Sequence, residues 1–142
     1  MKLIEQLHIT ENKLEIIPHA SLKGTYLKEN FFLTVEKINL KEIPLNILLT
    51  PFIFNIAPII WLSGKEFTLD TLNEYTHESL RNLKEIFVSL YPSISFQGSI
   101  KPETVLKDTT TVANTQYKKS IALFSGGLDS ITTVYRQYDN LK

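Results

Sequence analysis

The pattern of apolar and polar positions over the first forty residues of the chain predicts β-structure. The polar residues 10–13 separate two of the predicted strands and fit the turn of a hairpin. The stretch 18–30 is irregular, and Gly24 and Asn30 are its turn formers. The predicted strands are residues 3–9, residues 14–17, which end before Pro18, and residues 31–35.

A run of twenty uncharged residues, Ile43 to Leu62, has about the length of a bilayer-spanning helix. It contains three prolines, each of which would interrupt one long helix, so a buried core divided by the prolines is favoured over a membrane span. Residues 47–49 are predicted to form a short inner strand. Thr50 and Pro51 resemble a helix cap followed by proline at the first helical position, which predicts a short buried helix after them. The prolines are Pro44, Pro51 and Pro58.

The clearest helical pattern runs from residue 72 to residue 90. A turn at Gly64 and Lys65 and a short strand over 66–69 are expected before it. Asp70 or Thr71 is expected to cap the helix, and Thr71 with Glu74 forms a capping-box pattern. Pro92 follows the last turn, which indicates that the helix ends before it. The apolar face predicted to pack on the sheet is Leu72, Tyr75, Leu80, Leu83, Ile86, Phe87 and Leu90.

Residues 93–100 alternate between apolar and small polar side chains, which predicts a half-buried strand. Periodicity is lost over 101–119, a stretch rich in threonine and lysine. The expected organisation is therefore an N-terminal α+β domain over 1–103, followed by a linker over 104–118. The apolar run 120–124 then fits a strand buried on both faces of a parallel sheet.

Composition narrows the functional classes. The chain has 142 residues, 15 basic and 15 acidic, and a formal net charge of zero. No basic patch is visible, so nucleic-acid binding has no electrostatic support. Cysteine is absent, which excludes disulfides and thiolate metal sites. Residues 1–8 do not resemble a signal peptide, and a cytoplasmic location is expected. The three histidines, His8, His19 and His77, have no metal-ligand spacing.

The candidate chemistry lies at the hexapeptide Ser125 to Ser130, between the apolar run and a segment with helical spacing. Two adjacent glycines allow backbone conformations that a Cβ would forbid and let a ligand approach the main chain. Unpaired amides at the start of a helix suit a phosphate group, and the two serines add hydroxyl donors. Asp129 can cap the helix or meet a metal ion. An ordinary tight turn between a strand and a helix is the alternative.

The sequence SGGLDS resembles the SGGxDS pyrophosphate loop of the PP-loop ATP pyrophosphatases. The resemblance implies an adenine-nucleotide α-hydrolase fold, with ATP and Mg²⁺ as cofactors. It also implies cleavage of ATP between the α and β phosphates, an adenylated intermediate and released pyrophosphate. Asp129 is the implied magnesium contact. The implied nucleotide-binding residues are Ser125, Gly126, Gly127, Leu128, Asp129 and Ser130.

With this resemblance the expected fold class is α/β: the α+β N-terminal domain, then the first strand–loop–helix unit of a doubly wound nucleotide-binding domain over 119–142. Only twelve residues follow Ser130, so we expect the chain to be the N-terminal portion of a longer protein. Among family members, 7-cyano-7-deazaguanine synthases with an extra N-terminal domain fit best. Leu123 and Phe124 before the loop and about 115 preceding residues without a cysteine-dependent glutaminase support that choice.

Two functional classes stay open. The first is an ATP-dependent ligase or ATP pyrophosphatase that acts on an unknown small molecule. The second is a non-catalytic interaction or recognition module with a remnant of the loop. No membrane or nucleic-acid partner is expected, and the sequence leaves the substrate and the oligomeric state open.

Overall fold

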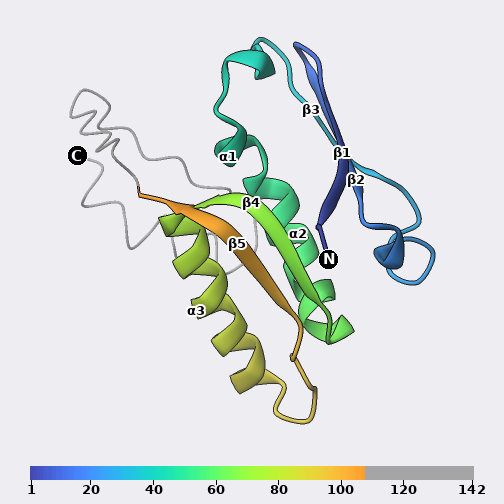
Figure 1. Cartoon of the computed structure of the whole chain (residues 1–142), viewed down its shortest axis with the longest axis vertical. Coiled ribbons are helices and arrows are strands. Elements are labelled where there is room, and N and C mark those ends of the chain that lie inside the picture. The colour runs from blue at the N-terminus through green and yellow to red at the C-terminus, as the bar shows by residue number, and fades with distance from the viewer. Residues whose placement is uncertain (108–142) are drawn as a thin grey trace, which may run out of the picture. The chain divides into compact units, whose positions relative to one another are not determined.

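The computed structural model describes residues 1–107, which belong to one compact unit of mixed helices and strands, in the general α/β class. The predicted strand 120–124 and the hexapeptide Ser125 to Ser130 lie outside the described residues. Figure 1 shows the order of the elements. Two short 3-10 helices, Ala20–Leu22 and Leu40–Glu42, lie in the connections.

Strands β1 (Ile4–Ile9), β2 (Lys13–Pro18) and β3 (Phe31–Thr34) form an antiparallel sheet in the order β1-β2-β3. These strands confirm the three predicted ones within a residue or so at each end. The predicted turn is confirmed as well, because the Thr10 N–H donates to the Lys13 carbonyl at 2.8 Å. β2 runs one residue further than expected, since Pro18 still lies opposite Ile4.

Strands β4 (Glu66–Asn73) and β5 (Ser99–Leu106) are parallel neighbours joined by helix α3 (Glu74–Leu90). The predicted strand over 93–100 is wrong: regular pairing begins only at residue 99. Phe96 and Gly98 are buried for another reason, because they pack against helices. The linker expected over 104–118 is also wrong at its start, because residues 104–106 still pair with β4. Because most side chains of residues 101–106 are exposed, this part of β5 shows no alternation of apolar and polar residues in the sequence.

Helix α3 begins three residues later than a cap at Asp70 would place it, and two residues later than a cap at Thr71. Residues 70–73 remain in β4, and the cap is Asn73, whose side-chain oxygen accepts from the Tyr75 N–H at 2.8 Å. The helix ends at Leu90, as expected from Pro92. Its inner face is narrower than predicted: Tyr75, Ile86 and Leu90 are exposed. The residues that face the core are Thr76, Leu80, Leu83 and Phe87.

The uncharged run forms helices α1 (Leu45–Leu48) and α2 (Thr50–Ser63), so the predicted strand over 47–49 is wrong. The helix after Pro51 is confirmed, but it has fourteen residues and contains Pro58. Thr50 does not cap it; the Thr50 hydroxyl donates back to the Asn46 carbonyl at 3.0 Å. Proline in a helix interior costs about 3 kcal/mol, and the buried side chains of α2 offset that cost. In residues 1–107 no helix combines the length and apolarity needed to cross a membrane.

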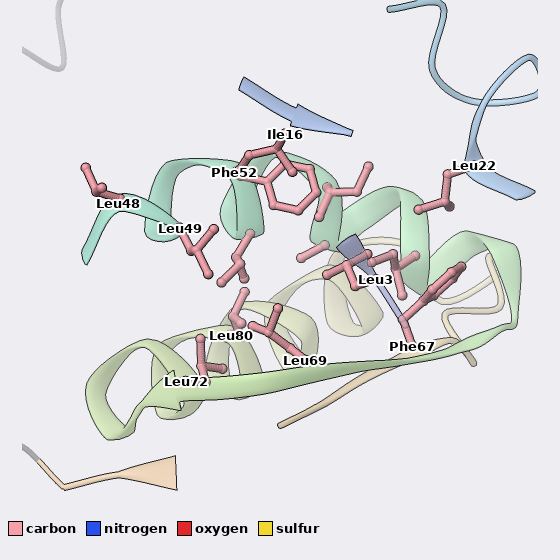
Figure 2. Packing of buried hydrophobic residues seen from close by; sticks show 14 of the residues in the cluster. Leu3, Ile16, Leu22, Leu48, Leu49, Phe52, Phe67, Leu69, Leu72 and Leu80 are labelled. Atoms are coloured by element: carbon pink, nitrogen blue, oxygen red, sulfur yellow. The ribbon is translucent and has the colours of Figure 1, made fainter. Parts of the chain in front are cut away.

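Helix α2 lies between β4 and the antiparallel sheet (Figure 1). Figure 2 shows Phe52 of α2 beside Ile16 of β2, while Phe67, Leu69 and Leu72 project from β4. Leu3 joins the two sheets. Its N–H donates to the Thr68 carbonyl at 2.8 Å, and its own carbonyl accepts from the His19 N–H at 2.9 Å. The first residues of the chain therefore pair with β4, and the chain then continues as β1, which pairs with β2.

Candidate functional site

The six residues of the predicted pyrophosphate loop lie outside the described part of the chain. The site residues Ser125, Gly126, Gly127, Leu128, Asp129 and Ser130 therefore stay predictions from the sequence. Several clefts within residues 1–107 bring polar and apolar side chains together, and two of them lie beside β4 and β5.

The first cleft lies between α3 and β5 and has a volume of about 160 Å³. Its apolar floor comes from three different elements: Trp61 of α2, Leu80 of α3 and Ile100 of β5. Trp61 is only 3% exposed and its ring stands edge-on to Phe87, with 5.6 Å between ring centroids. This agrees with the buried core predicted for the run from Ile43 to Leu62. The polar side chains that line the cleft are His77, Arg81, Lys84 and Ser99.

Three of these side chains form a basic flank on α3: His77, Arg81 and Lys84. Their spacing of four and then three residues places them along one side of the helix, next to its buried face. The same helical geometry places Glu74, Glu78 and Glu85 together on the side that faces away from the core. The spacing of the basic residues was visible in the sequence, but the position of β5 beside them was not.

Lys84 is the best-fixed charge in this cleft. Its ammonium group donates to the Gly98 carbonyl oxygen at 2.7 Å, and partial burial lowers the pKa of the group. Arg81 and Lys84 form no salt bridge with any carboxylate of residues 1–107. Two of the three ammonium hydrogens of Lys84, and the whole guanidinium of Arg81, therefore stay free of ion pairing within this part of the chain.

The carboxylate across the cleft is already paired. The Ser99 hydroxyl donates to Glu66 at 3.4 Å, and the same carboxylate oxygen lies 2.7 Å from the Lys101 ammonium. The hydrogen bond from Lys101 is the main reason that the pKa of Glu66 lies below its ordinary value. Glu66 and Lys101 together add little net charge to this side of the cleft.

The second cleft lies where β1 and β4 diverge beyond the pairing of Lys2 with Thr68. It has a volume of about 180 Å³, and its apolar wall includes Leu45, Leu49 and Leu69. An exposed ion pair joins the Lys2 ammonium to Asp70 at 3.2 Å at its edge. Both side chains are about two-thirds exposed, so the pair is screened by solvent and contributes little to stability.

The outer edge of β5 is blunted by a proline. Alternate residues of a parallel strand direct both backbone groups to the same neighbour. The Ser99 N–H donates to the Lys65 carbonyl of the β4 side at 3.0 Å, which places the backbone of Pro102 on the opposite, outer side. A proline there removes one donor from this edge, which has no partner strand within residues 1–107, and such a proline is a common protection against pairing with other chains.

Among residues 1–107 no group of three or more His, Cys, Asp or Glu side chains is placed to hold a metal ion. His19 has a local role: its Nδ1 accepts from the Ser21 N–H at 3.1 Å at the start of a 3-10 helix. Its ring also stands edge-on to Phe67.

Comparison of the chain with known protein families, with curated proteins and with solved structures finds no match.

Proposed function

We propose that the chain is the N-terminal portion of an ATP-dependent ligase of the PP-loop pyrophosphatase type, which adenylates a small-molecule substrate and releases pyrophosphate. The observation that carries this proposal is the hexapeptide Ser125 to Ser130. It matches SGGxDS at every specified position and follows an apolar run that suits a buried strand.

In this proposal the loop acts on the leaving group. The amides of residues 126–130 and the hydroxyls of Ser125 and Ser130 would donate hydrogen bonds to the β and γ phosphates of ATP. Such donors stabilise the charge that builds up on pyrophosphate as the bond to the α phosphate breaks. Mg²⁺, when bound, offsets part of the phosphate charge, and Asp129 is the residue that would hold it.

The member of the family that we favour is one similar to the 7-cyano-7-deazaguanine synthases, with an additional N-terminal domain. Leu123 and Phe124 before the loop and the lack of cysteine in this chain support that choice. A glutaminase that depends on a cysteine nucleophile cannot be built from these residues. The acceptor molecule stays open, and a cell extract supplies candidate acceptors in the experiment below.

The second candidate is a non-catalytic interaction or recognition module. It is supported by the exposed apolar side chains of α3, where Tyr75 is 67% and Leu90 65% exposed. Ile86 lies one turn before Leu90 on the same side of the helix and is exposed as well. Exposed apolar groups that gather on one side of a helix often mark a contact with another protein.

The products of ATP distinguish the two candidates. The complete protein is incubated with ATP, Mg²⁺ and a deproteinised cell extract that supplies acceptors, and phosphorus NMR follows the products. The ligase proposal predicts equal amounts of AMP and pyrophosphate, and loss of both with Gly127→Val. Formation of ADP and phosphate would contradict it. An absence of both turnover and ATP binding would favour the interaction module.

A further inference from the structure

We infer that the cleft between α3 and β5 is a binding site for a small anionic molecule that carries one ring. The described residues that line the cleft all belong to residues 61–100, so the inference does not rest on the SGGLDS loop. Its shape, its lining and its unpaired charges each limit what it can bind.

The size of the cleft limits the ligand to one ring. A cavity of about 150 Å³ holds a benzene molecule, and this cleft measures about 160 Å³. The apolar part of its surface comes from Trp61, Leu80 and Ile100, which can cover the body of such a ring. A larger, fused-ring molecule would extend into solvent.

The charges at the cleft select an anion. Arg81 and Lys84 lie one turn apart on α3, and neither is paired with a carboxylate of residues 1–107. His77 lies a further turn away on the same flank. The hydrogen bond to Gly98 holds the Lys84 ammonium in one position, so less side-chain freedom is lost on binding. A carboxylate or phosphate is the group that two adjacent cations bind well.

The nearby carboxylates do not cancel this preference. Glu66 is paired with Lys101 at 2.7 Å. Glu78 and Glu85 are helical neighbours of Arg81, three residues before it and four after it, but neither lines this cleft and neither forms an ion pair within residues 1–107. A ligand in the cleft therefore meets Arg81 and Lys84 first.

The test uses Trp61, the only tryptophan of the chain, which forms part of the cleft floor. Benzoate and phenyl phosphate are titrated into the full 142-residue chain while the fluorescence of Trp61 is followed. Benzyl alcohol and benzylammonium serve as neutral and cationic controls. We expect saturable binding of at least one anion with a dissociation constant of about 1 mM, ordinary for a ligand of about ten heavy atoms. The controls should bind at least about tenfold more weakly.

Matched variants locate the site. Arg81→Gln should weaken binding about fivefold, and combining it with Lys84→Met should weaken it by more than about tenfold. Lys23→Gln makes the same change of charge at an exposed position outside the cleft, so it should leave the affinity unchanged. Arg81 makes no side-chain hydrogen bond within residues 1–107, so Arg81→Gln keeps the test valid if the lysine variant fails to fold.

Three results would overturn the inference. One is the absence of any saturable change of Trp61 fluorescence with either anion. Another is equal binding of benzyl alcohol, which would show that charge plays no part. The third is unchanged affinity in Arg81→Gln, which would place any anion binding elsewhere on the molecule.

Discussion

The ammonium group of Lys84 donates a hydrogen bond to the carbonyl oxygen of Gly98 at 2.7 Å. The N–H of the same glycine donates to the Trp61 carbonyl at 2.9 Å. Both backbone polar groups of a buried residue are thus paired, one with α3 and the other with the end of α2. Through these two hydrogen bonds Gly98 connects α2 with α3 at the residue just before β5.

Gly98 has no room for a side chain. A Cβ at this position would overlap the carbonyl oxygen of Ile60 and lie 2.7 Å from its carbonyl carbon. Because these are backbone atoms of α2, a helix must shift to relieve the clash. We expect Gly98→Ala to lower the free energy of unfolding by roughly 2–4 kcal/mol, measured by urea denaturation.

Gly64→Ala is the matched control. A Cβ at Gly64 meets no atom within 4 Å, but the residue has a φ of +67° at the end of α2. The left-handed backbone conformation alone costs about 1 kcal/mol for alanine. A smaller loss for Gly98→Ala than for Gly64→Ala would contradict the close packing of Gly98 on α2.

Lys84 and Lys101 offer a test of how burial strengthens a polar contact. Lys84→Met leaves the carbonyl oxygen of buried Gly98 without this donor, so we expect the free energy of unfolding to fall by about 1 kcal/mol. This loss lies at the low end of the range for an unsatisfied buried group, because the lysine is only partly buried. Lys101→Met removes a surface ion pair with Glu66 whose lysine side chain is 64% exposed. Such pairs contribute about 0–1 kcal/mol. Thermal denaturation of both variants should show the larger effect for Lys84→Met.

Glu15 links β2 to the connection before β3 and should make stability depend on pH. A hydrogen bond from the Asn30 amide, at 3.1 Å, is the main reason that the pKa of Glu15 lies below its ordinary value, and Lys13 adds to the effect. A depressed pKa in the folded state contributes stability above the unfolded pKa of about 4.3, and this is lost as pH falls through the folded pKa.

We therefore expect the difference in urea midpoint between the unmodified chain and Glu15→Gln to be larger at neutral pH than at acidic pH. Glu11→Gln is the control, since the Glu11 side chain makes no hydrogen bond within residues 1–107. A Glu15→Gln difference that stays the same down to pH values below the folded pKa would argue against the bond with Asn30.

Features that depend on local chemistry could be predicted from the sequence. The turn over residues 10–13, the turn at Gly64 and the end of α3 before Pro92 follow from neighbouring residues alone. The core position of the uncharged run and the helix after Pro51 were predicted correctly, although the strand over 47–49 was not. These features require no knowledge of what packs against them.

The errors have a common physical cause, which is packing between distant parts of the chain. Pro58 lies inside α2 because buried neighbours outweigh its missing hydrogen bond. Asn73 caps α3 because β4 continues further than its own sequence suggests, through pairing with β5. The cleft beside Arg81 could be inferred only in part, since helical spacing predicts the basic flank but not the strand opposite it.

The SGGLDS loop gives separable expectations for two side chains in the complete protein. Ser130→Ala removes a hydroxyl donor to a charged oxygen, which is worth roughly 1.5–3 kcal/mol of ATP binding. Asp129→Ala should shift the magnesium dependence of ATP binding if Asp129 holds the metal. If it acts only as a helix cap, the variant should lower stability and leave that dependence unchanged. Binding titrations at several magnesium concentrations distinguish the two roles.

The most direct test of the proposed function is calorimetric titration of ATP with Mg²⁺ into the complete protein and into its Gly127→Val variant. A branched side chain at Gly127 blocks the close approach of phosphate to the backbone and disfavours a positive φ. We predict measurable ATP binding by the unmodified protein and at least a tenfold loss, about 1.4 kcal/mol or more, in the variant. Equal affinity of the two proteins for ATP would contradict the assignment of the loop to phosphate binding.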